Sequence, residues 1–271
     1  MYKLISFDID GTLFSYDPHA YGISKATVSL LERLQSAGYI LVVNTGRCWR
    51  DIPATIVPYF TYFILNNGGV LCNAKGETLS AIPIDSKTVQ RFFQTCERMS
   101  KSFILKTKYQ SYYYCNDGTY PPYLFYDNGV NFQYEAADLT TDAVYTLCME
   151  LEEEELPQWR QSFPDLVFVH GGYRYYEINA CTADKGNALF VLLEALQIKP
   201  KETIAFGDGM NDYAVLRSVG IGAAMKNGHP YLLRELEVIC DSVTENGIEK
   251  LLVNLGILEG MLFKEAVHQT R

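Results

Sequence analysis

Short apolar runs that end at polar turn residues mark the first part of the chain. The first run spans residues 4–9 and stops at Asp10-Gly11, and similar runs follow at residues 40–43 and 62–65. Nearly continuous apolar runs of this length are typical of strands that are buried on both faces of a parallel sheet. The pattern therefore predicts three buried strands near the N-terminus.

A helix is predicted between the first two of these strands. Ser24 is a good helix N-cap, the apolar residues between 30 and 37 follow helical spacing, and Gly38 is a natural C-terminal stop. A strand, a helix and a second strand joined by short connections form a βαβ unit, which implies a right-handed crossover.

The pattern of predicted elements changes after the turn Asn66-Asn67-Gly68-Gly69. Antiparallel hairpins are indicated, together with helices that start near Ser86 as N-cap and near Glu152. The segment 103–132 is crowded with tyrosines, which favours strands and an aromatic surface or core. We expect strands at 70–72, 78–82, 144–151, 166–169 and 173–178.

The alternation of helix and strand returns at Asp184. Helices are predicted at 188–196, 210–219 and 248–255, and strands at 203–206, 221–225 and 238–240. The simplest architecture is an α/β fold, with a doubly wound, Rossmann-like parallel sheet as core and an inserted α+β cap domain. The expected division is core at 1–82, cap at 83–182 and core again at 183–271.

Composition and charge exclude several classes of protein. The chain has 48% hydrophobic and 20% charged residues and a net charge of −9, with no basic stripe, so a nucleic-acid partner is disfavoured. No apolar run is long enough to span a bilayer, and no signal-peptide pattern is present. The seven cysteines include no CxxC pair, which favours free thiols in the cytoplasm over disulfides or a zinc site.

Polar motifs follow the predicted core strands at their C-terminal ends. They read FDIDGTLF at 7–14, NTGR at 44–47 and FGDGMND at 206–212, and Asp184-Lys185-Gly186 stands at a helix start. In open α/β sheets, ligands bind outside the carboxyl ends of the strands. The sequence therefore predicts one site at this edge.

The residue types in these motifs indicate the chemistry. Asp8, Asp10 and Asp208 would repel one another unless a cation lies among them, and an all-oxygen ligand set suits Mg²⁺. Thr45 offers a hydroxyl and Gly46 an unhindered N–H to phosphate oxygens. No Walker A sequence is present, and a carboxylate is a known nucleophile in phosphoryl transfer.

The four motifs together, DIDGTL, NTGR, a lysine followed by glycine, and GDGMND, resemble those of the haloacid dehalogenase (HAD) superfamily. The long insert between the second and third motifs resembles the Cof-type (class IIB) members. This resemblance implies a hydrolase that forms an aspartyl-phosphate. Asp8 would be the nucleophile and Asp10 the general acid and base, and Mg²⁺ would be held by Asp8, the Asp10 carbonyl and Asp208.

The resemblance implies roles for the other motif residues as well. Asp212 would support the metal waters or orient Lys185, although a first-turn helix acid that favours the helix dipole is the alternative. The role of Arg47 varies within the subgroup, and Thr12 would lie beside the catalytic groups. The phosphate would be held by Ile9, Thr45, Gly46, Lys185 and Asn211.

The leading hypothesis is a Mg²⁺-dependent phosphatase that hydrolyses a small phosphorylated metabolite, such as a sugar phosphate or a phosphorylated cofactor. A phosphomutase, and a phospholigand-binding protein without turnover, are the alternatives. A dehalogenase is disfavoured because it would not need Asp10. The cap at 83–182 is expected to choose the substrate and to supply no catalytic carboxylate. The oligomeric state is left open.

Overall fold

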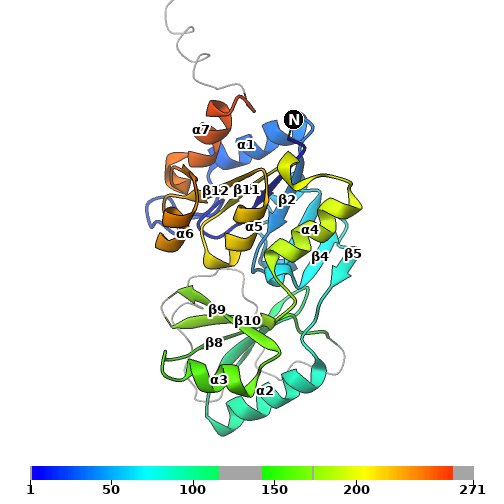
Figure 1. Cartoon of the computed structure of the whole chain (residues 1–271), viewed down its shortest axis with the longest axis vertical. Helices are drawn as coiled ribbons and strands as arrows, with labels where there is room; N and C mark the ends of the chain where they lie inside the picture. The colour runs from blue at the N-terminus through cyan, green and yellow to red at the C-terminus, as the bar shows by residue number, and fades with distance from the viewer. Residues whose placement is uncertain (1, 116–141, 173, 259–271) are drawn as a thin grey trace, which may run out of the picture.

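The computed structural model describes residues 2–115, 142–172 and 174–258 of the chain. Two sheets divide these residues between a large core and a smaller cap (Figure 1). The cap sheet is built by the chain between Ala81 and Thr203, so it interrupts the core sheet in sequence. The prediction of an α/β core with an inserted α+β cap is confirmed.

The core sheet has eight strands in the order β13-β12-β11-β1-β2-β3-β4-β5. The strands from β13 to β3 are parallel, whereas β4 and β5 extend the sheet as an antiparallel hairpin at one edge. The strands are β1 (Leu4–Phe7), β2 (Ile40–Asn44), β3 (Tyr62–Leu65), β4 (Val70–Asn73), β5 (Thr78–Ala81), β11 (Thr203–Gly207), β12 (Ile221–Met225) and β13 (Val238–Cys240).

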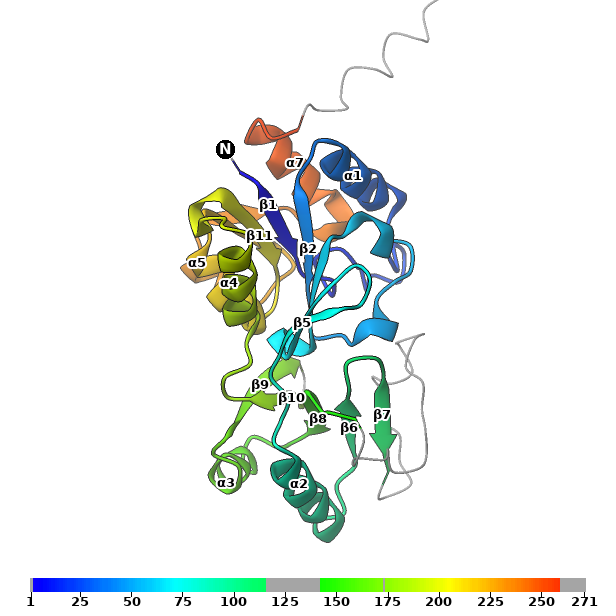
Figure 2. The same ribbon diagram turned by 90° about the vertical axis from the view of Figure 1, so that its right-hand side faces the viewer.

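Helices cover both faces of the core sheet (Figure 2). Side chains alternate along each strand, so Ile5 and Phe7 pack on the side of α1 and α7, while Leu4 packs on the side of α4, α5 and α6. This explains why the strands are apolar at nearly every position. The helices are α1 (Lys25–Ser36), α4 (Lys185–Ala195), α5 (Tyr213–Ser218), α6 (Pro230–Glu235) and α7 (Gly247–Asn254).

The cap is an antiparallel sheet with two helices on the side away from the core (Figures 1 and 2). Its strand order is β7-β6-β8-β10-β9. One face of this sheet therefore packs against helices, and the other lies over the core. The elements are α2 (Ser86–Arg98), β6 (Phe103–Lys106), β7 (Ser111–Tyr114), β8 (Thr146–Glu150), α3 (Leu156–Ser162), β9 (Leu166–Gly172) and β10 (Tyr175–Ala180).

Most predicted elements are present, and the differences lie at their ends. Ser24 caps α1 as predicted, but α2 is capped by Asp85, whose carboxylate accepts the Thr88 N–H, so Ser86 is the first helical residue. The predicted helix at 210–219 begins as a 3₁₀ turn, Met210–Asp212, before α5. The short helix α6 was not predicted. The tyrosines at 120, 123 and 126 and Pro121-Pro122 lie outside the described residues.

Two further expectations concern membranes and cysteines. Among the described residues, no helix combines the length and the apolar character that crossing a bilayer requires. All seven cysteines lie in the described part of the chain and are free thiols, five of them buried, as expected from their spacing.

The cap has an aromatic core that can be tested independently of the site. Phe92 on α2 is fully buried and packs against Trp159, with ring centroids 5.3 Å apart. We expect Phe92→Ala to lower the free energy of unfolding by about 3–5 kcal/mol, because it leaves a cavity in the core. Phe190→Ala, at a position 37% exposed on α4, is the control and should cost about 1 kcal/mol or less.

Urea denaturation followed by tryptophan fluorescence measures both changes. Equal midpoints for the two variants would show that the packing around Phe92 does not stabilise the cap.

Candidate active site

Three neighbouring strands bring the motif residues to one edge of the core sheet. Asp8 follows the end of β1, Thr45 follows β2 and Asp208 follows β11. These strands are adjacent and parallel in the order β11-β1-β2, so the three residues leave the sheet side by side. The predicted site edge is therefore formed by segments far apart in the sequence, and the cap lies over it (Figure 1).

Lys185 is the buried centre of this edge. It is the first residue of α4, which Asp184 caps by accepting the Asn187 N–H at 2.8 Å. Its side chain is only 1% exposed, and Nζ donates to Asp8 Oδ1 at 2.9 Å and to Asp212 Oδ1 at 2.7 Å. Burial alone would lower the pKa of Lys185, but Asp212 and Asp8 raise it, so the ammonium stays charged.

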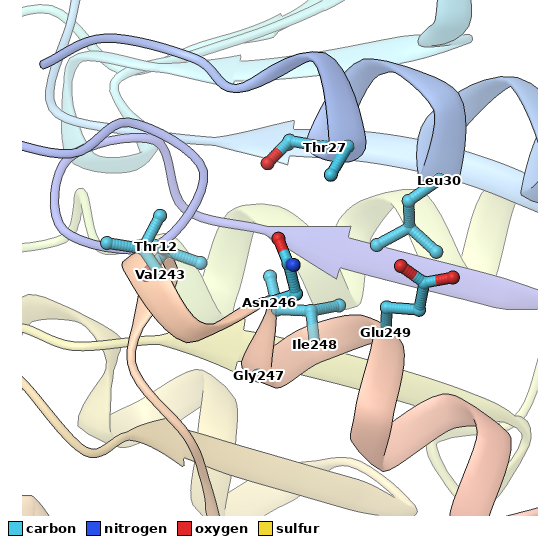
Figure 3. A pocket seen from close by; sticks show the side chains of 9 residues that line it. Thr12, Thr27, Leu30, Val243, Asn246, Gly247, Ile248 and Glu249 are labelled. Atoms are coloured by element: carbon cyan, nitrogen blue, oxygen red, sulfur yellow. The ribbon is translucent and has the colours of Figure 1, made fainter. Parts of the chain in front are cut away.

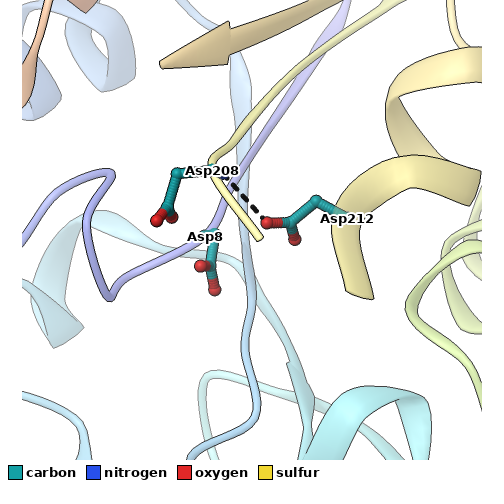
Figure 4. Close-up of side chains that lie close together, drawn as sticks. All are labelled: Asp8, Asp208 and Asp212. Atoms are coloured by element: carbon teal, nitrogen blue, oxygen red, sulfur yellow. Dashed lines mark hydrogen bonds between the residues drawn. The ribbon is translucent and has the colours of Figure 1, made fainter. Parts of the chain in front are cut away.

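Asp212 organises the loop after β11. Its second oxygen, Oδ2, accepts the backbone N–H groups of Asp208 and Gly209, each at 3.0 Å. Carboxylate oxygens of Asp8, Asp208 and Asp212 lie within 4.8 Å of one another. Figure 4 shows the three side chains close together. Thr12 approaches from the first motif and donates its hydroxyl to Asp208 Oδ1 at 3.0 Å.

The electrostatics of this cluster favour a bound cation. Burial raises the pKa of Asp8 well above its usual value; Lys185 opposes this rise, and the neighbouring aspartates add to it. Burial and the charge of Asp212 likewise raise the pKa of Asp208 to about 7. One lysine thus does not neutralise three clustered carboxylates. An all-oxygen set with excess negative charge fits Mg²⁺, which agrees with the expected cofactor.

Asp10 is set apart from this cluster. Its side chain is 38% exposed and lies against Arg47, which donates from Nη2 to Asp10 Oδ1 at 2.7 Å and from Nε to Oδ2 at 3.0 Å. The Tyr16 hydroxyl donates to Asp10 Oδ1 at 2.5 Å. Burial alone would raise the pKa of Asp10, but Arg47 and Tyr16 lower it. Asp8 and Asp10 are therefore in different electrostatic surroundings despite their spacing.

The residues expected to hold phosphate lie around the same edge. Ile9 is buried, and its carbonyl closes the turn of the first motif by accepting the Phe14 N–H at 2.8 Å. The hydroxyl of the buried Thr45 accepts the Arg47 N–H at 3.2 Å. Asn211 donates its side-chain amide to Asn67 Oδ1 at 2.9 Å. Gly46 carries no side chain to hinder an approach to its backbone.

Sequence reasoning missed several side chains that reach this edge. Tyr16 follows the first motif closely and bonds to Asp10, but a tyrosine in a loop gives no signal of that contact. Asn67 belongs to the predicted turn Asn66-Asn67-Gly68-Gly69, but a turn signal does not show that its side chain reaches this edge. Lys106 on β6 and Glu177 on β10 come from the cap, and Lys106 Nζ donates to the Gly46 carbonyl at 3.1 Å. Only the alternation of residues along these two strands could have shown which face they occupy.

A small cavity lies behind the first motif, between α1 and α7 (Figure 3). Its volume is about 10 Å³, enough for at most a single water molecule. It is too small for a substrate and is not the reaction site. It is lined by Thr12, Ala26, Thr27, Leu30, Val243, Asn246, Gly247, Ile248 and Glu249.

Comparison of the sequence with known proteins agrees with this geometry. The family model described as haloacid dehalogenase-like hydrolase matches residues 5–252. An HMP-PP phosphatase of Yersinia pseudotuberculosis is 27% identical over 255 residues, which cover 87% of this chain and 88% of the relative. The HMP-PP phosphatase of Yersinia enterocolitica is 29% identical over the same shares of the two chains.

Solved structures show the same fold. A phosphatase of the HAD superfamily from Bacteroides thetaiotaomicron superposes with a TM-score of 0.82 at 20% identity, covering 95% of this chain and 96% of that one. A sugar phosphatase of HAD subclass IIB superposes with a TM-score of 0.80 at 23% identity, covering 94% and 100% of the two chains. The likeness extends over the core and the cap together.

A glycine in the first motif offers a test of the carboxylate cluster. Gly11 has φ +74°, and a Cβ added there would lie 2.3 Å from Asp208 Oδ2. We expect Gly11→Ala to displace Asp208 and weaken Mg²⁺ binding about tenfold or more, as loss of a supporting contact does in other metal sites. Titration calorimetry with Mg²⁺ measures the change.

Gly76→Ala is the matched control. Gly76 has nearly the same backbone angle, φ +77°, but no atom lies within 4 Å of an added Cβ. Both variants carry a similar backbone strain of about 1–2 kcal/mol, and only Gly11→Ala should lose Mg²⁺ affinity. Equal affinities would mean that the contact between Gly11 and Asp208 does not shape the metal site.

Proposed function

The chain belongs to the family of haloacid dehalogenase-like hydrolases, and on that basis we propose that it is a Mg²⁺-dependent phosphatase that hydrolyses small phosphate monoesters through an aspartyl-phosphate. The substrate would be a sugar phosphate or a phosphorylated cofactor, in keeping with relatives named HMP-PP phosphatase and sugar phosphatase. A cytoplasmic location goes with this proposal.

One observation carries the proposal. Lys185 is buried between Asp8 and Asp212, while Asp10 stands outside the carboxylate cluster and is held by Arg47. Two carboxylates two residues apart thus have different partners, which allows them different tasks in one reaction. Asp8 has the surroundings of a group that shares its site with a cation and an anionic phosphate. Asp10 is 38% exposed, so it can exchange a proton with solvent or substrate when its hydrogen bonds to Arg47 open.

In the first step an Asp8 oxygen attacks the phosphorus of the ester. The bond between Asp8 and phosphorus forms, the ester P–O bond breaks, and Asp10 gives its proton to the leaving oxygen. Lys185, Thr45, Gly46, Asn211 and the Ile9 backbone would hold the phosphate oxygens in place. Their donors can neutralise charge that develops on the phosphoryl group.

In the second step water replaces the enzyme on phosphorus. Asp10, now a carboxylate, takes a proton from water as the water oxygen bonds to phosphorus, and the bond to Asp8 breaks. The hydrogen bonds from Arg47 and Tyr16 restrict the rotation of the Asp10 side chain. Mg²⁺ would be held by Asp8, Asp208 and the Asp10 carbonyl, and when bound it supplies positive charge to the phosphate oxygens.

The proposal assigns the substrate choice to the cap. We place the cap at residues 83–182 between the two parts of the core, 1–82 and 183–271. Its open face lies over the site edge, so that a leaving group extending from the phosphate would meet it. No observation favours a phosphomutase or a binding protein over hydrolysis, and release of free phosphate from an ester separates hydrolysis from both.

The proposed metal dependence gives one prediction. Chelation with EDTA should abolish phosphate release from 4-nitrophenyl phosphate, and added Mg²⁺ should restore it, because Asp8 and Asp208 repel each other and the substrate without a cation. Phosphate release is measured on the same preparation before and after chelation. Full turnover by the metal-free chain would contradict the proposal.

The division of labour between Asp8 and Asp10 gives another. Asp8→Asn should lose both steps and form no adduct, because an amide is a poor nucleophile. Asp10→Asn should keep the first step with an activated aryl ester, whose leaving group needs little protonation. Its second step should slow by about two to four orders of magnitude, the usual contribution of general acid–base catalysis.

Rapid-quench kinetics on both variants measures these steps. Asp10→Asn should show a burst of aryl alcohol and a mass increase on the peptide that carries Asp8. Absence of the burst and of the adduct in both variants would mean that the two roles are assigned wrongly.

A further inference from the structure

The face of the cap sheet that lies over the core carries charged side chains. On β6, Phe103 and Leu105 pack into the cap core. Side chains alternate along a strand, so Lys106 lies on the opposite face of the sheet, where it reaches Gly46. On β10, Tyr176 and Ile178 pack inward in the same way. Glu177 therefore lies on the opposite face, above the NTGR loop.

Lys106 and Glu177 form an ion pair against the proposed phosphate loop. Lys106 Nζ lies 3.3 Å from Glu177 Oε1 and donates to the Gly46 carbonyl at 3.1 Å. The two side chains are only 13% and 14% exposed. A Cβ added to Gly46 would lie 3.0 Å from both Glu177 oxygens, so the carboxylate rests directly on this glycine.

Asn67 connects Glu177 to the core. Its Nδ2 donates to Glu177 Oε2 at 2.7 Å, and its Oδ1 accepts from Asn211 Nδ2 at 2.9 Å. An amide has its donor and its acceptor on opposite ends, so the bond to Glu177 decides which end Asn67 turns to Asn211. Asn67 is 4% exposed, and little room is left for other arrangements.

A carboxylate this close to a phosphate site is unsuited to hold phosphate itself, because the two anions repel each other. Lys106 neutralises Glu177 and thereby limits this repulsion. Glu177 can therefore act on the phosphate site through the hydrogen bond that it accepts from Asn67. In the same way, the bond from Lys106 to the Gly46 carbonyl fixes the orientation of the peptide that follows Gly46.

We propose that Glu177 and Lys106 are positioning residues that complete the phosphate site from the cap, Glu177 through Asn67 and Lys106 through Gly46. The inference rests on the proposed function, in which Asn211 and Gly46 hold the phosphate. It means that the cap prepares the phosphate site in addition to meeting the leaving group. Neither cap residue touches the reacting atoms.

Inorganic phosphate is the probe for this inference, because it occupies the phosphate site and has no leaving group. Its affinity is measured by titration calorimetry in the presence of Mg²⁺. We expect Glu177→Ala to weaken phosphate binding about five- to tenfold, the effect of losing one oriented hydrogen bond. Glu177→Gln keeps one acceptor for Asn67 but turns its amide NH2 toward Lys106, so it should weaken phosphate binding less than Glu177→Ala does.

Glu155→Ala is the matched control. Glu155 pairs with Lys101 at 2.7 Å inside the cap, and the contacts of this pair all lie within the cap. This variant also loses an ion pair between a lysine and a glutamate of the cap, and it should bind phosphate unchanged. Asn67→Ala tests the same relay from the core side, since it removes both the acceptor for Asn211 and the donor to Glu177. It should also bind phosphate about tenfold more weakly, and it decides the matter if Glu177→Ala does not fold.

Other outcomes overturn the inference. Unchanged phosphate affinity in Glu177→Ala, with a raised KM for an ester, would assign Glu177 to recognition of the leaving group. Equal weakening in Glu177→Ala and Glu177→Gln would assign it a role through charge alone. Absence of phosphate binding by the unaltered chain would remove the proposed function and, with it, the site that these residues are inferred to complete.

Discussion

The site depends on one ammonium group buried between two carboxylates. Lys185 is held by Asp8 and Asp212, and all three are almost completely withdrawn from solvent. Removing one partner from such a group leaves a charge without compensation, which typically costs about 3–5 kcal/mol. Because Asp212 also binds the backbone of the loop that carries Asp208, the lysine fixes the ends of β1 and β11 and the start of α4 relative to one another.

This arrangement leaves the edge of the sheet with more negative than positive charge. The pKa of Asp8 and that of Asp208 are both raised, because burial and the neighbouring aspartates disfavour their charged forms. A divalent cation bound there would offset the repulsion between these carboxylates. The pKa of Asp10 is lowered instead, because Arg47 lies against its carboxylate, so Asp8 and Asp10 differ in the direction of their pKa shifts although both are aspartates.

Much of this could be predicted from local signals in the sequence. The buried strands are apolar at nearly every position, and Ser24 precedes its helix at the expected place, so β1, β2 and α1 follow directly. The short helix α6 was missed because Pro230 begins only six helical residues, too few to show a period. The predicted cap Ser86 differs by one position from the observed cap Asp85, because serine and aspartate cap helices about equally well and stand side by side here.

The motif residues at the sheet edge were predictable for a different reason than the cap contacts. Asp8, Thr45 and Asp208 each follow a strand, and parallel strands bring their ends together whatever their separation in sequence. The contact of Glu177 with Asn67 depends instead on how the cap sits on the core. No propensity or spacing encodes it, because it arises from the three-dimensional placement of two separately patterned sheets.

The pairing of β1 with β11 has a consequence for how the chain assembles during synthesis. Leu4 pairs with Thr203, so one side of β1 has no neighbour until the whole cap segment has emerged. At about 5–20 residues per second this takes on the order of ten seconds. During this time β1 is an uncovered, apolar sheet edge, which is the kind of surface that favours pairing with other chains. The cap sheet, in contrast, takes all its strands from one continuous stretch of chain and does not have to wait for the core.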